Sequence, residues 1–156
     1  MQSPADMINE ALKEAKVADY VLDITSKVVK DKKIVVSTLM HLKKSIILSM
    51  KSYLSYLKEK GRIRNVFSTD ELVYEYFMQN HSAEFLQSFE DRKNFSSIFD
   101  SMKSYDYRGM ILEKEGKYTF ISKDYELINL KFEELKKFIK TAIDFSKSLE
   151  AKIKND

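Results

Sequence analysis

The sequence predicts a mainly α protein: a helical bundle built on two long antiparallel helices, with a small β-hairpin near residues 110–122 before a C-terminal helix. Three observations support this fold class. Gly and Pro are rare, at three and one in 156 residues, which favours long helices over loop-rich or all-β folds. Apolar residues recur at helical spacing through most of the chain. This period changes only near residues 110–122, where short apolar runs flank a turn.

The longest helix is expected over residues 32–60, and the rest of the chain is organised around it. One apolar stripe continues through about six turns, at Val35, Leu39, Leu42, Ile46, Met50, Tyr53 and Leu57. Val36, Ile47 and Leu54 widen this stripe to about half of the circumference, which indicates contact with more than one neighbouring helix. Gly61 follows the last periodic residue, where a left-handed C-terminal cap is usual.

A first helix is predicted over residues 4–29, with Ser3 as its N-cap and Pro4 at its first position. Its acidic side chains are expected to pair with lysines of the central helix if the two helices pack antiparallel. A third helix is predicted over residues 69–80, where Ser68 and Glu71 form a capping box.

Two more helices are expected over residues 83–105, with a candidate break at residues 94–96, and over residues 131–154. The hairpin between them is centred on Gly116. Residues 125–130 are a candidate third strand. The whole chain, residues 1–156, is expected to form a single domain.

Composition excludes several function classes. The chain has no Cys, so disulfides, thiolate nucleophiles and Cys-ligated zinc are absent, and a reducing compartment is favoured. No apolar run reaches the roughly 18 residues of a membrane span, and the N-terminus does not resemble a secretion signal. We expect a cytoplasmic protein that needs no cofactor.

No catalytic constellation is recognised, so a non-enzymatic protein is expected. His41 and His81 lie outside any metal-ligand spacing. His41 falls on the polar face of the central helix and is interpreted as solvated, whereas His81 is interpreted as a capping or turn residue. There is no Gly-x-Ser-x-Gly elbow. An enzyme with an unrecognised site around one of these histidines stays open as an alternative.

A basic stripe on the central helix is the candidate binding surface. Residues 26–64 contain eleven basic and two acidic side chains, a surplus of nine positive charges. The candidate nucleic-acid-binding residues are Lys44, Lys51, Lys58, Lys60, Arg62 and Arg64. Tyr53 and Tyr56 lie nearby, and lysines beside aromatic rings suit phosphate contacts and base stacking. The alternative is that these cations are solvated or paired with the acidic segment 65–106.

Two stretches carry a family resemblance. The first runs from Ala18-Asp19-Tyr20 through the long helix that ends at Tyr56-Leu57-Lys58 and Arg62-Ile63, and the second is the hairpin and helix from Lys117 to Lys136. Both resemble a family of small uncharacterised archaeal helical proteins. The bundle is also similar to HEPN proteins, which act as RNases or as partners of minimal nucleotidyltransferases, but no Arg precedes His41 or His81 at the HEPN nuclease spacing of Arg-x4–6-His. The resemblance implies an archaeal cytoplasmic protein with a non-catalytic, partner-binding role.

Two functions are therefore expected in competition. The first is an interaction module that binds a protein partner or forms a homodimer, which the wide apolar stripe favours. The second is an RNA- or DNA-binding protein that uses the basic stripe. No membrane or small-molecule partner is implied.

Overall fold

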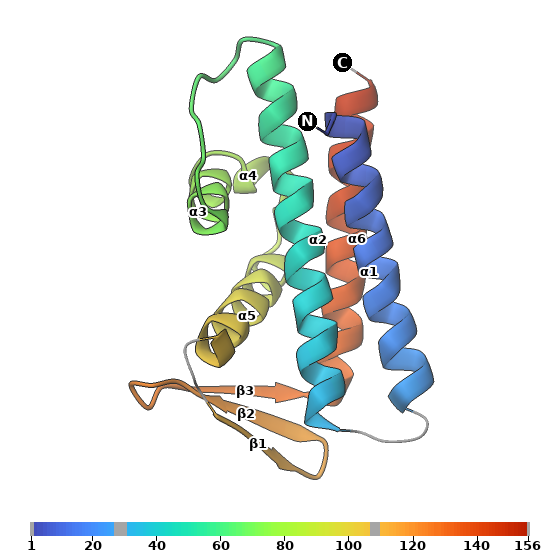
Figure 1. Ribbon diagram of the computed structural model, residues 1–156, viewed down its shortest axis with the longest axis vertical. Helices are drawn as coiled ribbons and strands as arrows, with labels where there is room; N and C mark the ends of the chain where they lie inside the picture. Colours follow the sequence, from blue (N-terminus) through green and yellow to red (C-terminus); the bar gives the residue numbers. More distant parts are fainter. Residues whose placement is uncertain (1, 27–30, 107–109, 156) are drawn as a thin grey trace.

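Helix α2 (Lys32–Glu59) runs through the middle of the molecule without a break, as the apolar period predicts (Figure 1). The structure is a computed structural model that describes residues 2–26, 31–106 and 110–155. Asp31 caps the start of α2 by accepting a hydrogen bond from the Lys33 amide at 3.2 Å. Gly61 ends it with a φ of 69°, so the predicted left-handed cap is confirmed.

Three long helices form the main layer of the bundle. Helix α1 (Pro4–Ser26) runs antiparallel to α2, whereas α6 (Phe132–Lys154) runs parallel to it (Figure 1). Ser3 caps α1 as predicted, accepting from the Asp6 amide at 3.1 Å. The expected continuation of α1 over residues 27–29 lies outside the described residues.

Small residues bring α1 and α2 close together. Ala11, Ala15 and Ala18 of α1 are completely buried, and their methyl groups leave room for serine hydroxyls of α2 to bond the α1 backbone. Ser45 Oγ donates to the Ala11 carbonyl at 2.7 Å, and Ser52 Oγ donates to the Pro4 carbonyl at 2.6 Å. Buried hydroxyls are tolerated here because each finds a partner.

The same pattern joins α2 to α6. Ser49 Oγ lies 2.7 Å from Ser146 Oγ and donates to the Ser45 carbonyl at 3.0 Å. Since the single proton of Ser49 is committed to that carbonyl, the Ser146 hydroxyl must donate to Ser49 Oγ. A chain of hydrogen bonds therefore crosses from α6 through α2 to α1.

Three shorter helices pack beside α2: α3 (Asp70–Asn80), α4 (Ser82–Phe85) and α5 (Phe89–Asp106). The N-cap of α3 is Thr69, not Ser68 as predicted, because the Thr69 hydroxyl accepts from the Leu72 amide at 3.2 Å. The single helix expected over residues 83–105 is also wrong. It is divided before Phe89.

The expected break at residues 94–96 is absent, and α5 continues through that point. Asn94 is buried there and donates from its side-chain nitrogen to Thr141 Oγ1 of α6 at 3.1 Å. This bond satisfies the polar side chain inside the bundle, so the helix does not need to unwind.

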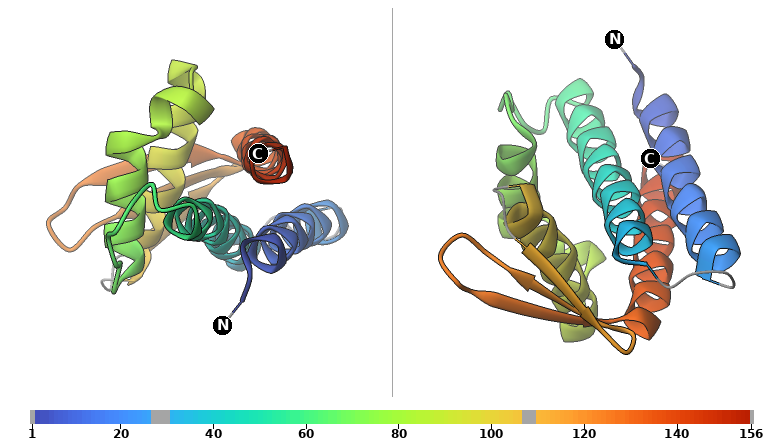
Figure 2. Two further views of the ribbon diagram at one scale, coloured as in Figure 1. Left: turned by 90° about the horizontal axis from the view of Figure 1, so that it is seen from above. Right: turned by 60° about the horizontal axis from the view of Figure 1, so that its bottom comes forward.

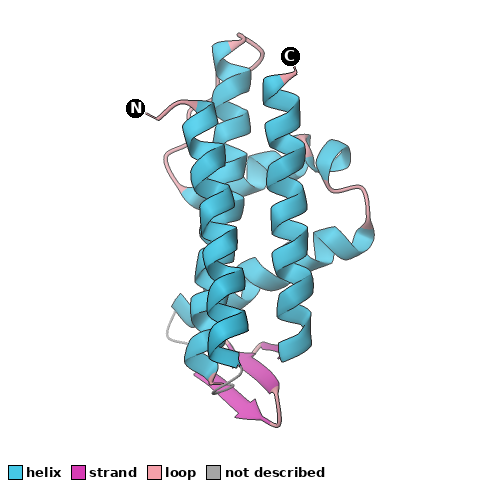
Figure 3. Ribbon diagram, turned by 90° about the vertical axis from the view of Figure 1, so that its right-hand side faces the viewer, coloured by secondary structure: helices cyan, strands magenta, loops and turns pink. Residues whose placement is uncertain are grey.

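Strands β1 (Met110–Lys114), β2 (Lys117–Ile121) and β3 (Leu127–Lys131) form an antiparallel sheet in the order β1-β2-β3. The predicted hairpin and third strand are both present. Glu115 and Gly116 connect β1 to β2 with φ values of 50° and 77°, the left-handed pair that a two-residue hairpin turn requires. Figure 3 shows the strands gathered at one end of the helices.

One face of this sheet packs against the bundle and the other points away from it. Tyr118, Phe120 and Leu130 are buried on the inner face, which lies against α5 (Figure 2, right).

Aromatic side chains pack α3 and α5 against α6. The Phe145 ring meets Phe77 at 5.4 Å and Phe95 at 4.9 Å between centroids, both edge to face, a favourable geometry for aromatic pairs.

Candidate functional site

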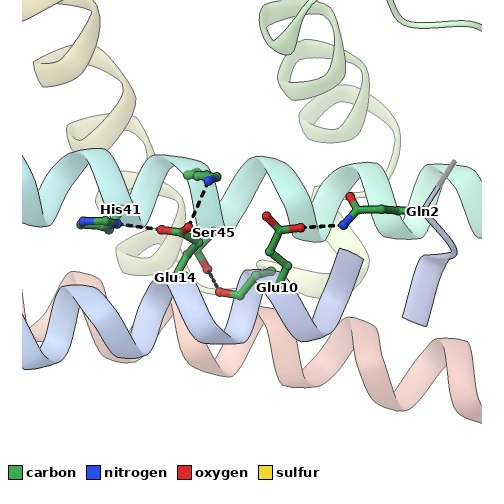
Figure 4. Close-up of polar contacts among 7 residues, drawn as sticks. Gln2, Glu10, Glu14, His41 and Ser45 are labelled. Atoms are coloured by element: carbon green, nitrogen blue, oxygen red, sulfur yellow. Dashed lines mark hydrogen bonds and ion pairs between the residues drawn. The ribbon is translucent and has the colours of Figure 1, made fainter. Parts of the chain in front are cut away.

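Lys44, the first cation of the predicted basic stripe, is paired with a carboxylate of helix α1. Glu14 lies between two side chains of α2, with Lys44 Nζ 3.1 Å from Oε1 and His41 Nδ1 2.7 Å from Oε2. Figure 4 shows His41 and Glu14 directed toward each other between the two helices. His41 is therefore paired rather than simply solvated, and the expected pairing between acids of the first helix and lysines of the central one is confirmed.

Opposing influences act on the pKa of Glu14. Burial of its carboxyl raises the pKa, whereas hydrogen bonds from His41 and Lys44 and their charges lower it, and the net result is a lowered pKa. The carboxylate is thus held ionised, and Lys44 has a carboxylate partner within its own chain.

Lys51, the next cation along the stripe, bonds Asp70 at the start of α3, with Nζ 2.9 Å from Oδ1. This contact is the internal pairing with segment 65–106 that the charge distribution left open. Both side chains are about half exposed, and pairs of this kind contribute little to stability.

The remaining cations of the stripe, Lys58, Lys60, Arg62 and Arg64, are exposed near the end of α2 and in the segment after it. Lys60 Nζ lies 5.9 Å from the centre of the Tyr56 ring. Tyr53 and Tyr56 are only 3% and 4% exposed, so neither ring offers a free face on which a base could stack. Nucleic-acid binding by this stripe stays a prediction, and the burial of both rings weakens its support.

His81 ends α3 as its C-cap, where its amide donates to the Phe77 carbonyl at 2.8 Å, so the expected capping position is confirmed. Its imidazole packs beside Tyr53, with 5.4 Å between ring centroids. Burial lowers the pKa of His81, an effect that the charge of Glu84 opposes. Its Nε2 atom is buried without a hydrogen-bond partner among the described residues. The His81 imidazole is therefore packed among aromatic side chains of α2 and α3.

A groove that the sequence did not predict lies between the start of α2 and strand β1. It has a volume of about 790 Å³. Val36 and Met40 form the α2 wall, Tyr105 contributes from the end of α5, and Ile111 and Leu112 contribute from β1. Met40 is 54% exposed, Tyr105 42% and Leu112 55%. A contiguous patch of exposed apolar side chains is typical of an interaction surface, whereas single exposed apolar residues are common on any protein.

The polar part of this groove is positive. Lys32 and Lys33 line it at the start of α2, and its described lining includes no carboxylate. Asp31, the neighbouring acid, is engaged as the N-cap. The groove therefore combines apolar walls with cations at one end.

Strand β1 is an edge of the sheet, since the strand order places only β2 beside it within the described part of the chain. The backbone N–H and C=O groups on the free side of an edge strand are available to pair with another extended chain. Met110 of β1, which also lines the groove, is 61% exposed. The free strand edge and the apolar groove are thus one continuous surface, which we call the β1 groove.

The outer face of the sheet carries three rows of side chains. The register places Lys114 opposite Lys117, and Lys117 opposite Lys131, so three exposed lysines form one row across the strands. The other two rows are Leu112, Thr119 and Asn129, and Met110, Ile121 and Leu127. The lysine row was not predicted from the sequence. A two-residue turn at Glu115-Gly116 would have revealed it, because such a turn fixes the register of its hairpin.

Among residues 2–26, 31–106 and 110–155, no cluster of His, Asp and Glu has a geometry that could hold a metal ion. In the same ranges no helix has both the length and the hydropathy of a bilayer-crossing segment.

Comparisons with known proteins give no match to this chain. No protein-family model, no curated protein and no solved structure is significantly similar to it. The resemblance to archaeal helical proteins and to the HEPN group therefore stays a prediction, and the function must be argued from the surfaces described above.

Proposed function

We propose that this protein is a non-enzymatic interaction module that binds an extended segment of a partner protein in the β1 groove, as a strand added beside β1. The observation that carries the proposal is a free strand edge that borders an apolar groove with a helix as its second wall. Strand addition of this kind obtains affinity from backbone hydrogen bonds and specificity from the side-chain contacts of alternate residues.

The two walls of the groove supply these two contributions separately. Strand β1 is five residues long, Met110–Lys114, and the backbone groups on its free side are available for pairing. Val36 and Met40 of α2 and Tyr105 of α5 offer an apolar surface for those side chains of the added strand that point toward the bundle. An added strand would also cover the exposed parts of Met40 and Tyr105, which gives it a hydrophobic contribution.

The chemistry of the groove favours a protein segment as its occupant. Its walls are apolar and its described charged residues are Lys32 and Lys33, so an extended segment with apolar and acidic side chains is complementary to it. A nucleic acid would leave the apolar walls without a partner. A second copy of this chain, paired β1 to β1, is another occupant that the free edge admits.

The test begins with selection of short peptides from a random displayed library on the full chain. Binding is then mapped by hydrogen exchange. We expect selected peptides to slow exchange at amides of β1, and we expect Met40→Glu to weaken their binding about tenfold, because it places a charge against the added strand. Leu72→Glu is the matched control, since Leu72 is 45% exposed on α3, away from the groove, and it should leave binding unchanged.

Two results would overturn the proposal. Selected peptides that protect amides elsewhere and bind the Met40→Glu protein normally would show that the β1 groove is not the binding surface. A stable dimer in light scattering, lost in Met40→Glu and retained in Leu72→Glu, would show that a second copy occupies the groove.

A further inference from the structure

The row of Lys114, Lys117 and Lys131 on the outer sheet face is unfavourable for the isolated fold. Directly opposed residues of adjacent strands have their Cβ atoms about 4.5–5.5 Å apart, and like charges in these positions are destabilising. This row contains two such pairs in succession.

No carboxylate of the described chain relieves this repulsion by an ion pair. None of the three ammonium groups forms one within the parts of the chain that the structure describes. Glu115 and Glu134 line the same surface as the row, and among the described residues neither forms an ion pair with it. Glu134, at the start of α6, uses Oε1 to accept from the Lys131 amide at 2.9 Å. Its carboxylate therefore caps the helix backbone.

One end of the row lies at the edge of the sheet that borders the β1 groove. Lys114 belongs to β1, one of the two edge strands, so a strand added beside β1 would place its own residue at the next position of the row. A cation there would extend the repulsion, whereas a carboxylate would lie beside Lys114 and relieve it.

We infer that the segment bound in the β1 groove carries Asp or Glu at the position opposite Lys114, so that the three-lysine row selects the residue and the register of its partner. This inference rests on the proposed function, because it assumes an added strand beside β1. It goes further by assigning a specificity-determining role to Lys114, supported by Lys117 and Lys131.

The register defines the rest of the segment. Two and four positions from the acid, the added residues lie beside Leu112 and Met110 on the outer face, and apolar side chains suit both places. Three positions from the acid, the added residue lies beside Ile111 and points toward the groove wall, where a large apolar side chain fits. The partner segment thus contains one acidic residue, one variable residue and three apolar residues in a row. This order runs forward or backward along the segment, depending on its direction relative to β1.

The experiment repeats the library selection on three full-length proteins: wild type, Lys114→Glu and Lys123→Glu. Lys123 is an exposed lysine in the loop after β2, outside the row, which makes it the matched control. We expect wild type and Lys123→Glu to enrich the same acid-containing pattern, and Lys114→Glu to enrich Lys or Arg at that position instead.

Binding of individual peptides gives the magnitude. A selected peptide whose acid is replaced by Lys should bind wild type roughly three- to tenfold more weakly, and should regain affinity for Lys114→Glu. The difference between the two peptides should shrink as salt is added, since the charges are exposed.

Failure of this inference differs from failure of the proposed function. If peptides protect the amides of β1 but show the same composition on wild type and Lys114→Glu, strand addition stands and the selective role of the lysine row is wrong. If no selected peptide protects β1 on any of the three proteins, strand addition itself is wrong, and the inference falls with it.

Discussion

Replacing the buried serines one at a time and together tests the direction of the hydrogen-bond chain between α6 and α2. Ser49→Ala removes the acceptor of the Ser146 hydroxyl and leaves a buried donor without a partner, which costs about 1–3 kcal/mol. Ser146→Ala leaves no such donor, because Ser49 still donates to the Ser45 carbonyl. The loss of one hydrogen bond then costs about 1 kcal/mol.

The double variant should be destabilised by less than the sum of the two single variants. It contains neither hydroxyl, so no donor is stranded, and we expect a coupling of about 1 kcal/mol, above the roughly 0.3–0.5 kcal/mol scatter of independent sites. The gain in helix propensity from Ser to Ala is common to the single and double variants and cancels from the coupling.

Urea unfolding followed by circular dichroism gives the free energy of unfolding of the wild type, the two single variants and the double variant. Ser148→Ala is the control partner for Ser49→Ala, because Ser148 is exposed and bonds only within its own helix, to the Asp144 carbonyl. That pair should be additive. If Ser49→Ala costs no more than Ser146→Ala and the two add, the assigned direction of the chain is wrong.

Three further predictions concern packing, pH and the turns. Phe145→Ala should lower the free energy of unfolding by about 3–5 kcal/mol, whereas Phe89→Ala, at a ring that is 80% exposed, should change it little; equal losses in urea unfolding would contradict the packing. Because burial lowers the pKa of His81, the unfolded chain binds more protons below the ordinary value of 6.5, so stability should fall there as pH drops, and His81→Phe should flatten that part of the urea-derived pH profile. Gly116→Ala and Gly61→Ala should each cost about 1 kcal/mol in thermal or urea unfolding, because both positions have a positive φ and nothing within 4 Å of an added Cβ; a neutral effect would show that the turn relaxes.

The sequence predicted the elements in which local and tertiary requirements agree. Helix α2 was expected over residues 32–60 and spans Lys32–Glu59, because its apolar stripe and its buried surface coincide. The hairpin was located by Gly116, whose φ of 77° only glycine adopts easily.

The boundaries between the short helices were predicted less well. A single helix over residues 83–105 would place Leu86 and Phe89, three positions apart, on one face. Instead Leu86 is 2% exposed and Phe89 80%, because the chain breaks between them and the helical phase changes. Ser88 marks the break: its hydroxyl accepts from the Asp91 amide at 3.0 Å and so caps α5. A serine three residues before an acid was the available indication of this start.

The candidate site depended on contacts that no local pattern encodes. The pairing of Lys44 with Glu14, and of Lys51 with Asp70, required the positions of α1 and α3 beside α2. The β1 groove joins residues near positions 36, 105 and 111, which only the fold brings together. Charge counts along the sequence therefore located the cations but could not say which of them were already paired.

The order in which the chain is made has a consequence for its biogenesis. Helices α1 and α2 are consecutive and pack as an antiparallel hairpin, but α6, which packs against both of them, is synthesised after every element of the sheet. Until α6 is synthesised, the apolar faces of α1 and α2 that it covers in the folded protein stay exposed. Nascent chains with exposed apolar surface are targets for chaperones and prone to aggregate, so the yield of folded protein in the cell should depend on how quickly α6 is translated.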